Sequence, residues 1–307
     1  MLSVDLCGVS LANPLIRASG ILGTEAELMA RVARDGAGAV TAKSCSLEPR
    51  AGHPNPTVLA WEHGLINAVG LANPGVEAEV EELVRTRALL RPLGAALIAS
   101  VFADTVANFA RVAARLVQAG PDLIEVNISC PNVHDEFGAP FAARAATAAE
   151  VTTAVKEAVQ GRVPVLVKLS PNVSDIADIA RAVESAGADG ISAINTLTGM
   201  LIDVQARRTV LDNRFGGLSG PAIRPLAVRC VYEIYRAVEI PIVGMGGISS
   251  GRDVVEMIMA GATAVGVGSA VYYDGPEAFG RIRHEIESLM GELGYDSVTE
   301  MRGVAHQ

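Results

Sequence analysis

Short apolar segments alternate with longer amphipathic segments along almost the whole chain. The apolar segments are five to eight residues long and nearly continuous, which is typical of parallel strands covered on both faces. Eight of them stand out, at 15–19, 39–44, 95–102, 123–129, 163–170, 190–196, 240–245 and 264–270. Segments with helical periodicity lie between and after them, at 25–35, 76–90, 105–119, 146–160, 174–187, 222–238, 250–260 and 276–292.

Capping residues support several of these predicted helix boundaries. Three helices begin near side chains that commonly cap a helix N-terminus, namely Asp104, Ser174 and Ser250. Four helices end at a glycine, which readily adopts the left-handed conformation found after a helix, namely Gly36, Gly120, Gly187 and Gly261. Eight β–α units in succession predict an α/β fold of one domain, 1–307, built as a closed (β/α)8 or TIM barrel. An open doubly wound sheet is the alternative, because strand number alone does not exclude it.

Three segments are too long to be simple connections between these elements. They run from 47 to 74, from 130 to 144 and from 196 to 221. Each follows the C-terminal end of a predicted strand, and barrel enzymes place their chemistry at that face. We therefore expect the active-site loops there.

Composition limits the classes of function. The chain has 307 residues, half of them hydrophobic and only 4% aromatic, so a large core must be built from aliphatic and small side chains. Its 25 basic and 34 acidic residues leave a net charge of −9, and no basic run occurs, which argues against nucleic-acid binding. The four cysteines form no C-x-x-C pair, so we expect neither a metal nor an iron–sulfur cluster in this chain.

The sequence carries no sign of export or membrane insertion. The first residues lack a basic segment followed by an apolar run, and no stretch of about 18 apolar residues occurs. So few cysteines in so long a chain also argue against a secreted disulfide framework. The expected location is the cytoplasm, with no membrane contact.

The fourth predicted strand ends in polar residues. Asn127 and Ser129 alternate with apolar Val126 and Ile128, which directs both polar groups to one face near the barrel mouth. Cys130 follows and opens one of the long segments. A thiol there could be a nucleophile, a general base or a buried apolar side chain, the last being the commonest role of a free cysteine. The neighbouring asparagines favour a functional role.

Two lysines, Lys43 and Lys168, end otherwise apolar strands. A lysine without a partner is costly to bury in a barrel core. One interpretation is that each extends its ammonium group to the barrel mouth. Because both occupy matching strand ends, we favour an anionic ligand or an electron-rich ring as their partner.

The last two predicted strands end in glycine clusters, at 244–247 and 266–269. In many barrels the loops after strands seven and eight hold a phosphate group, because glycine lets backbone N–H groups approach it closely. Two tight turns are the alternative, but they leave the pairing of the clusters unexplained. Neither a P-loop nor the G-x-G-x-x-G dinucleotide motif is present.

Taken together, these segments resemble the class 1 dihydroorotate dehydrogenases. The matching stretches follow the family order and cover nearly the whole chain. They are NPLIRASG (13–20), AKSCSLEPRAGHPNPT (42–57), NAVGLANPG (67–75), EVNISCPN (125–132), VKLSPN (167–172), INTLTG (194–199), GGLSGPAI (216–223), GMGGISS (244–250) and VGVGSA (265–270). Glycine motifs of this kind occur in many barrels, whereas the combination is specific.

The resemblance implies a function and a set of site residues. The family binds FMN at the barrel mouth and oxidises dihydroorotate to orotate in pyrimidine biosynthesis, and Cys130 matches its catalytic base. Substrate-side positions match Lys43, Asn67, Ala68, Val69, Gly70, Leu71, Asn127, Asn132, Asn195 and Thr196. FMN-side positions match Ser19, Gly20, Lys43, Ser44, Ser100, Asn127, Lys168, Ile194, Gly220, Gly246, Gly247, Gly268 and Ser269.

These residue types suit that reaction. Dihydroorotate carries a carboxylate and a cyclic imide, and asparagine offers paired donors and acceptors to an amide edge. The base removes the proton at carbon 5 while hydride leaves carbon 6 for the flavin. A thiolate can act as this base where nearby positive charge lowers its pKa.

The resemblance also implies an electron acceptor. Cysteine at the base position separates the chain from class 2, which has serine there and a membrane helix. The stretches NTLTGMLIDVQARR (195–208) and GGLSGPAI (216–223) are similar to subclass B. Members of that subclass form an assembly with a second subunit that carries FAD and a 2Fe–2S cluster and passes electrons to NAD. We therefore expect a homodimer within a heterotetramer with that subunit. Three features depart from the family pattern: Ser100 in place of asparagine, Ser269 in place of threonine, and the sequence of 133–141.

Alternatives come from within and outside this family. Subclass A enzymes are homodimers that reduce fumarate. The dihydropyrimidine dehydrogenase type shares the barrel and the cysteine loop but reduces uracil, with the cysteine as general acid. A phosphate-binding barrel without catalytic activity is a different class of function, and the polar strand ends and Cys130 argue against it.

Overall fold

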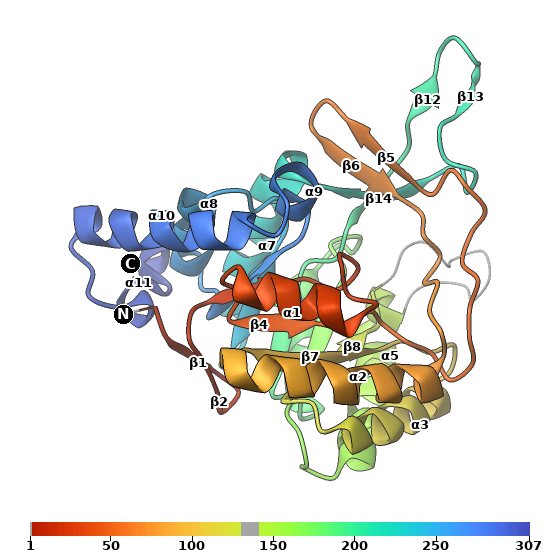
Figure 1. Cartoon of the computed structure of the whole chain (residues 1–307), viewed down its shortest axis with the longest axis horizontal. Helices are drawn as coiled ribbons and strands as arrows, with labels where there is room; N and C mark the ends of the chain where they lie inside the picture. Colours follow the sequence, from red (N-terminus) through yellow and green to blue (C-terminus); the bar gives the residue numbers. More distant parts are fainter. Residues whose placement is uncertain (1, 130–140) are drawn as a thin grey trace.

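Eight parallel strands close into a barrel in the computed structural model, which describes residues 2–129 and 141–307 (Figure 1). Strands that are neighbours in sequence are neighbours in the barrel, and the last pairs with the first. Each predicted apolar run contains one of them, so the predicted (β/α)8 barrel is confirmed. The strands are β3 (Leu15–Arg17), β4 (Ala39–Thr41), β7 (Ala96–Val101), β8 (Leu123–Asn127), β9 (Val165–Leu169), β10 (Gly190–Ala193), β15 (Ile242–Met245) and β16 (Ala264–Val267).

One helix of each predicted β–α unit covers the outside of the barrel, close to the predicted bounds. Figure 1 shows α1 and α2 side by side along one flank. The eight covering helices are α1 (Ala26–Arg34), α2 (Val76–Leu90), α3 (Val106–Leu116), α5 (Ala145–Val159), α6 (Ile176–Ser185), α7 (Arg224–Tyr235), α8 (Gly251–Met259) and α10 (Ala278–Leu293). Two short helices, α9 (Ala270–Asp274) and α11 (Val298–Met301), complete the C-terminal part.

The predicted helix caps are partly confirmed. Ser250 caps α8, with Asp253 completing a capping box. Asp104 and Ser174 were each one residue too early: the capping oxygens belong to Thr105 and Asp175, which have the extended backbone that an N-cap needs. All four predicted glycine stops follow their helices with a positive φ. Among the described residues, no helix is long and apolar enough to cross a membrane.

A hairpin that the sequence analysis did not predict lies at the amino-terminal end of the barrel. β1 (Val4–Leu6) pairs antiparallel with β2 (Val9–Leu11), and both strands end in fully buried leucines. Between them the Cys7 thiol donates a hydrogen bond to the carbonyl of Asp189, just before β10 begins (3.2 Å). The hairpin therefore packs against the end of the barrel opposite the strand C-termini.

Two of the long predicted loops pair with each other to form an antiparallel sheet. The sheet has the order β11 (Leu197–Gly199), β14 (Gly216–Ser219), β6 (Gly64–Asn67), β5 (Val58–Trp61). A further hairpin, β12 (Ile202–Asp203) with β13 (Arg208–Thr209), extends from it. Figure 1 shows this sheet on the side away from the two termini. It brings residues about 150 positions apart in sequence, such as Asn67 and Gly217, into register.

Candidate active site

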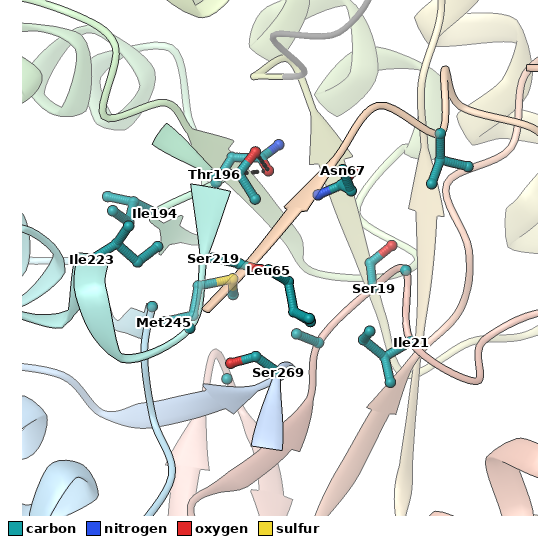
Figure 2. A pocket seen from close by; sticks show the side chains of 18 of the residues that line it. Ser19, Ile21, Leu65, Asn67, Ile194, Thr196, Ser219, Ile223, Met245 and Ser269 are labelled. Atoms are coloured by element: carbon teal, nitrogen blue, oxygen red, sulfur yellow. Dashed lines mark hydrogen bonds between the residues drawn. The ribbon is translucent and has the colours of Figure 1, made fainter. Parts of the chain in front are cut away.

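The polar strand ends meet in one pocket at the C-terminal end of the barrel (Figure 2). Its lining comes from β8, β9, β15 and β16, from the segments after β3, β4, β10, β15 and β16, and from the antiparallel sheet with the residues that follow β6 and β14. Parallel barrel strands all present their carboxyl ends on one face, so residues distant in sequence converge there. This is the face on which the sequence analysis predicted the site.

One part of the pocket is an apolar wall. Figure 2 shows Ile194, Ile223 and Met245 on one side, with Leu65 between them and Ile21. Such a wall suits one face of a flat, largely apolar ring. Apart from Ile194, these residues were not predicted as site residues. Ile223 and Met245 lie inside motifs that we noted, but single apolar residues there cannot be told from core residues by sequence alone.

The ends of β15 and β16 form a glycine cradle, Gly246, Gly247 and Gly268. Gly246 and Gly247 have φ values of 135° and 74°, and a Cβ on Gly247 would lie 2.8 Å from the carbonyl oxygen of Gly220. Side chains are therefore excluded where the backbone turns. A Cβ on Gly268 would instead find its nearest neighbour 3.8 Å away, at Ala18, which leaves open space on the pocket side. This arrangement lets a ligand approach the backbone closely.

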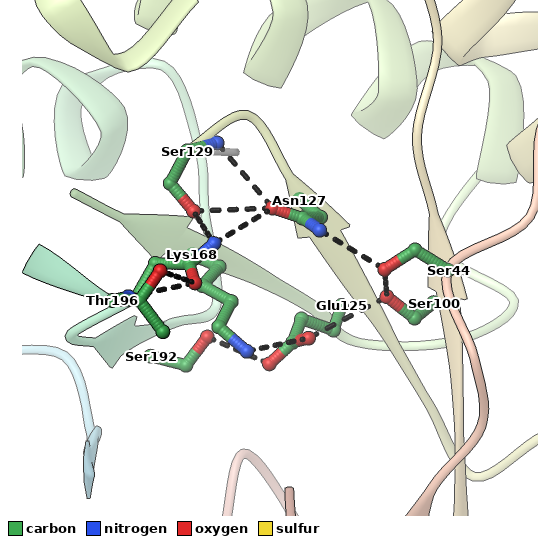
Figure 3. A network of polar contacts seen from close by, with 9 residues as sticks. Ser44, Ser100, Glu125, Asn127, Ser129, Lys168, Ser192 and Thr196 are labelled. Atoms are coloured by element: carbon green, nitrogen blue, oxygen red, sulfur yellow. Dashed lines mark hydrogen bonds and ion pairs between the residues drawn. The ribbon is translucent and has the colours of Figure 1, made fainter. Parts of the chain in front are cut away.

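A hydrogen-bond network fixes the side-chain amides of the pocket (Figure 3). Asn127 donates through Nδ2 to the Ser44 hydroxyl (3.0 Å) and accepts through Oδ1 from the Ser129 hydroxyl (3.1 Å). Asn195 donates to the same Ser129 oxygen (3.0 Å), and its own Oδ1 accepts from the backbone N–H of Thr196 (2.8 Å). Since each amide has assigned partners, its donor and acceptor ends point in defined directions.

The two lysines line the same pocket in different surroundings. Lys168 is buried, and its ammonium nitrogen lies 3.4 Å from a carboxylate oxygen of Glu125 on the adjacent strand. We had expected a ligand to be the partner of both lysines, and the sequence analysis did not predict this ion pair of Lys168. Lys43 is half-buried and follows the end of β4. Glu125 could have been noticed as the one charged residue in the predicted strand 123–129.

Comparison with known proteins assigns the chain to a family. A family model described as dihydroorotate dehydrogenase matches residues 1–290. The chain belongs to the dihydroorotate dehydrogenase family. The resemblance found in the motifs is thereby confirmed.

Three relatives similar to this chain carry the same name, "Dihydroorotate dehydrogenase B (NAD(+)), catalytic subunit". The protein from Methanothermobacter thermautotrophicus is 47% identical over 307 residues, covering 100% of this chain and 99% of the relative. The one from Methanosarcina mazei is 47% identical, covering 100% and 96%. The one from Pyrococcus abyssi is 43% identical over 305 residues, covering 99% of each.

Most residues that the dihydroorotate dehydrogenase resemblance singled out lie in the pocket. The structure brings together Ser19, Gly20, Lys43, Ser44, Asn67, Val69, Gly70, Leu71, Asn127, Lys168, Ile194, Asn195, Thr196, Gly220, Gly246, Gly247, Gly268 and Ser269. Cys130 and Asn132 lie outside the described residues. Their roles stay predictions.

Two residues predicted for the site do not line the pocket. Ala68, the residue after β6, packs with Ile66 in a small apolar cluster, whereas the alternate residues Leu65 and Asn67 line the pocket. Ser100 is buried beneath the pocket, where its hydroxyl lies 2.8 Å from that of Ser44 and 3.5 Å from Glu125.

Two buried charged residues behind the pocket also escaped prediction. Arg17 is fully buried and donates to the carbonyl of Ile21 (2.6 Å), and burial lowers its pKa to about 9, which leaves it a cation at neutral pH. Glu79 in the first turn of α2 is 2% exposed, and burial raises its pKa to about 8. Within the described part of the chain, Arg17 Nε and Nη2 and Glu79 Oε1 have no hydrogen-bond partner.

Proposed function

We propose that this chain is the catalytic subunit of an NAD-linked dihydroorotate dehydrogenase, which oxidises dihydroorotate to orotate with bound FMN in pyrimidine biosynthesis. Membership of the family supports the reaction, and the names of the relatives support the acceptor. The observation that carries the proposal is that one pocket combines a glycine cradle and an apolar wall with oriented asparagines.

The pocket fits FMN on chemical grounds. The cradle offers backbone to a phosphate, and Ile194, Ile223 and Met245 offer apolar surface to the flavin ring. When bound, FMN supplies the acceptor for the hydride of the substrate. Residues proposed to hold it are Ser19, Gly20, Lys43, Ser44, Asn127, Lys168, Ile194, Gly220, Gly246, Gly247, Gly268 and Ser269.

The oriented amides suit the substrate. Asn127 and Asn195, with Asn67 from β6, present donors and acceptors to the imide edge of dihydroorotate. Lys43 lies in the same pocket and can balance the substrate carboxylate. The segment 69–71 and Thr196 complete the substrate side, and Asn132 is proposed as a further amide contact.

Cys130 is proposed as the general base. It follows Ser129, whose hydroxyl is hydrogen-bonded to both Asn127 and Asn195, so the chain enters the cysteine segment next to the proposed substrate amides. Its thiolate would take the proton from carbon 5 of dihydroorotate. Positive charge nearby favours the thiolate form, and Lys43 lies in the same pocket.

The flavin content and substrate preference test this proposal. We expect the purified protein to be yellow and to hold one noncovalent FMN per chain, because the cradle and the apolar wall form one continuous site. Dihydroorotate should bleach the flavin and dihydrouracil should not, since only dihydroorotate brings a carboxylate for Lys43. The measurement is the visible spectrum before and after anaerobic addition of each compound. FAD alone, no flavin, or bleaching by dihydrouracil only would contradict the proposal.

Electrons are proposed to leave through a partner subunit that carries FAD and a 2Fe–2S cluster, with this chain as a homodimer in a heterotetramer. The words "catalytic subunit" and "NAD(+)" in the names of the relatives support this route. We expect the isolated chain to oxidise dihydroorotate with an artificial dye but to reduce NAD hardly at all. Steady NAD reduction by the isolated chain at a matching rate would overturn the partner. Rapid turnover with fumarate would indicate subclass A instead.

A further inference from the structure

The carboxylate of Glu125 lies inside the barrel beside the ammonium group of Lys168 (Figure 3). One oxygen is 3.4 Å from the Lys168 ammonium and 3.5 Å from the Ser100 hydroxyl, and the other accepts a hydrogen bond from the Ser192 hydroxyl (3.0 Å). Polar side chains from β7 and β9, which flank β8, and from β10, the next strand beyond β9, thus converge on one residue of β8. The side chains of Glu125 and Lys168 are only 3% and 6% exposed.

Only one member of this ion pair reaches the pocket. Lys168 lines it, whereas Glu125 does not. An ion pair so far from water gains little net stability, because desolvation offsets most of the attraction. Stability alone is therefore a weak reason for placing a carboxylate at this position. A stronger reason is the effect of this carboxylate on Lys168, which lines the pocket.

Glu125 also connects to the rest of the site. The Ser100 hydroxyl that it contacts lies 2.8 Å from that of Ser44, which in turn accepts from Asn127 (3.0 Å). One buried carboxylate thus anchors a chain of contacts that ends at a proposed substrate amide. Burial lowers the pKa of Arg17, and the negative charge of Glu125 opposes this lowering more than that of Glu79 does. Glu125 therefore interacts with two buried cations behind the pocket.

We propose that Glu125 is a positioning residue that holds Lys168 at the flavin site and offsets its charge, and so sets how strongly the pocket prefers reduced over oxidised FMN. The inference rests on the proposed function, because it requires FMN in this pocket. It acts through Lys168 and needs no contact between Glu125 and the flavin. In the low-dielectric barrel interior, a change of one charge beside Lys168 is poorly screened.

The decisive variant is Glu125→Gln, which keeps the size of the side chain and removes its charge. The charge of Lys168 is then no longer offset, and the more negative, reduced form of the flavin gains. We expect the ratio of affinities for reduced and oxidised FMN to rise about tenfold. For a two-electron couple this is a midpoint potential about 30 mV more positive. The potential is measured by equilibrating the bound flavin with a reference dye.

A double-mutant cycle separates positioning from a general structural effect. The same Glu125→Gln change is made in a Lys168→Met background, where no lysine is left to position and only the direct effect of the Glu125 charge on the flavin remains. We expect a clearly smaller shift in potential than in the single variant, because the part that acts through Lys168 is gone. An equal shift in both backgrounds, or no shift in either, would overturn the proposal. Ser192→Ala, which removes one hydrogen bond to Glu125 but no charge, serves as the matched control and should leave the potential near the wild-type value.

A second variant keeps the test decisive if Glu125→Gln does not fold. Glu125→Asp retains the charge but withdraws the carboxylate by one methylene, so we expect a smaller shift of the same sign. An unchanged potential in Glu125→Asp would then count against the proposal. If the wild-type protein does not bind FMN, the proposed function itself is contradicted. If the variants bind FMN with an unchanged midpoint potential, only the role of Glu125 is contradicted.

Discussion

Replacing Cys130 by serine is expected to slow the reduction of bound flavin by dihydroorotate by about 10²–10⁴-fold at neutral pH, the usual cost of losing a general base. Binding of FMN and orotate should change little, because a hydroxyl replaces a thiol of similar size. A base must exist in its deprotonated form, and serine is a much weaker acid than cysteine. The rate should therefore recover in part as the pH rises.

Single-turnover bleaching of the flavin by dihydroorotate across a pH series measures this effect. Cys7→Ser is the matched control, since Cys7 lies in the hairpin at the opposite end of the barrel and serine can also donate to the carbonyl of Asp189. It should bleach at the wild-type rate. Wild-type rates in Cys130→Ser at neutral pH would remove Cys130 as the base. A stable covalent adduct on Cys130 during turnover would indicate a nucleophile instead.

Replacing Glu79 by glutamine is expected to stabilise the protein increasingly as the pH rises from about 5 to about 8. Burial raises the pKa of Glu79 from its ordinary value of 4.5 to about 8, with Glu82 adding to the rise and Arg17 and Lys43 opposing it. Between these values the folded protein keeps a proton that the unfolded chain has lost. The protonated Glu79 therefore makes its full contribution to the unfolding free energy of the wild type below about pH 4.5. This contribution is lost as the pH rises through about 8.

The size of the effect follows from the same shift. One pKa unit corresponds to about 1.4 kcal/mol, so the difference in unfolding free energy between Glu79→Gln and wild type should grow by at most about 4 kcal/mol between pH 5 and pH 8. Glutamine stays neutral at every pH in the window. The measurement is denaturant unfolding of both proteins at pH 5, 6, 7 and 8.

The control for this prediction comes from the same helix. Glu81 is exposed on α2, so Glu81→Gln should give a stability difference that hardly varies with pH. A difference between Glu79→Gln and wild type that is constant with pH would show that Glu79 loses its proton normally in the folded protein. A difference that shrinks with rising pH would contradict the sign of the prediction.

Local patterns were enough to predict the barrel and its covering helices. Strands buried on both faces appear as continuous apolar runs, and each covering helix repeats its apolar positions every three to four residues. Both signals lie within one element and need no knowledge of its partners. The helix caps show the limit of this approach. Thr105 and Asp175 were missed by one residue because the extended backbone of an N-cap is not visible in the sequence.

The chain by itself also determined most of the pocket. A motif at the end of a parallel strand must reach the same face as the other strand ends, so Lys43, Asn127 and Gly246 could be assigned to one site before any contact was known. The family resemblance added particular roles. Ser100 and Ala68 were assigned to the site by the same resemblance but do not line the pocket, because a position in a motif does not say which way a side chain points.

Tertiary structure alone decided which distant residues are partners. Pairing of β6 with β14 turned two long segments into one sheet beside the pocket. The ion pair between Glu125 and Lys168 depends on the register of β8 against β9, which aligns Asn127 with Lys168 and thus puts the lysine two residues along from the glutamate. The burial of Glu79 depends on how α2 packs against the barrel. Register and packing are set by contacts summed over the whole fold, and for that reason no local stretch of sequence contains them.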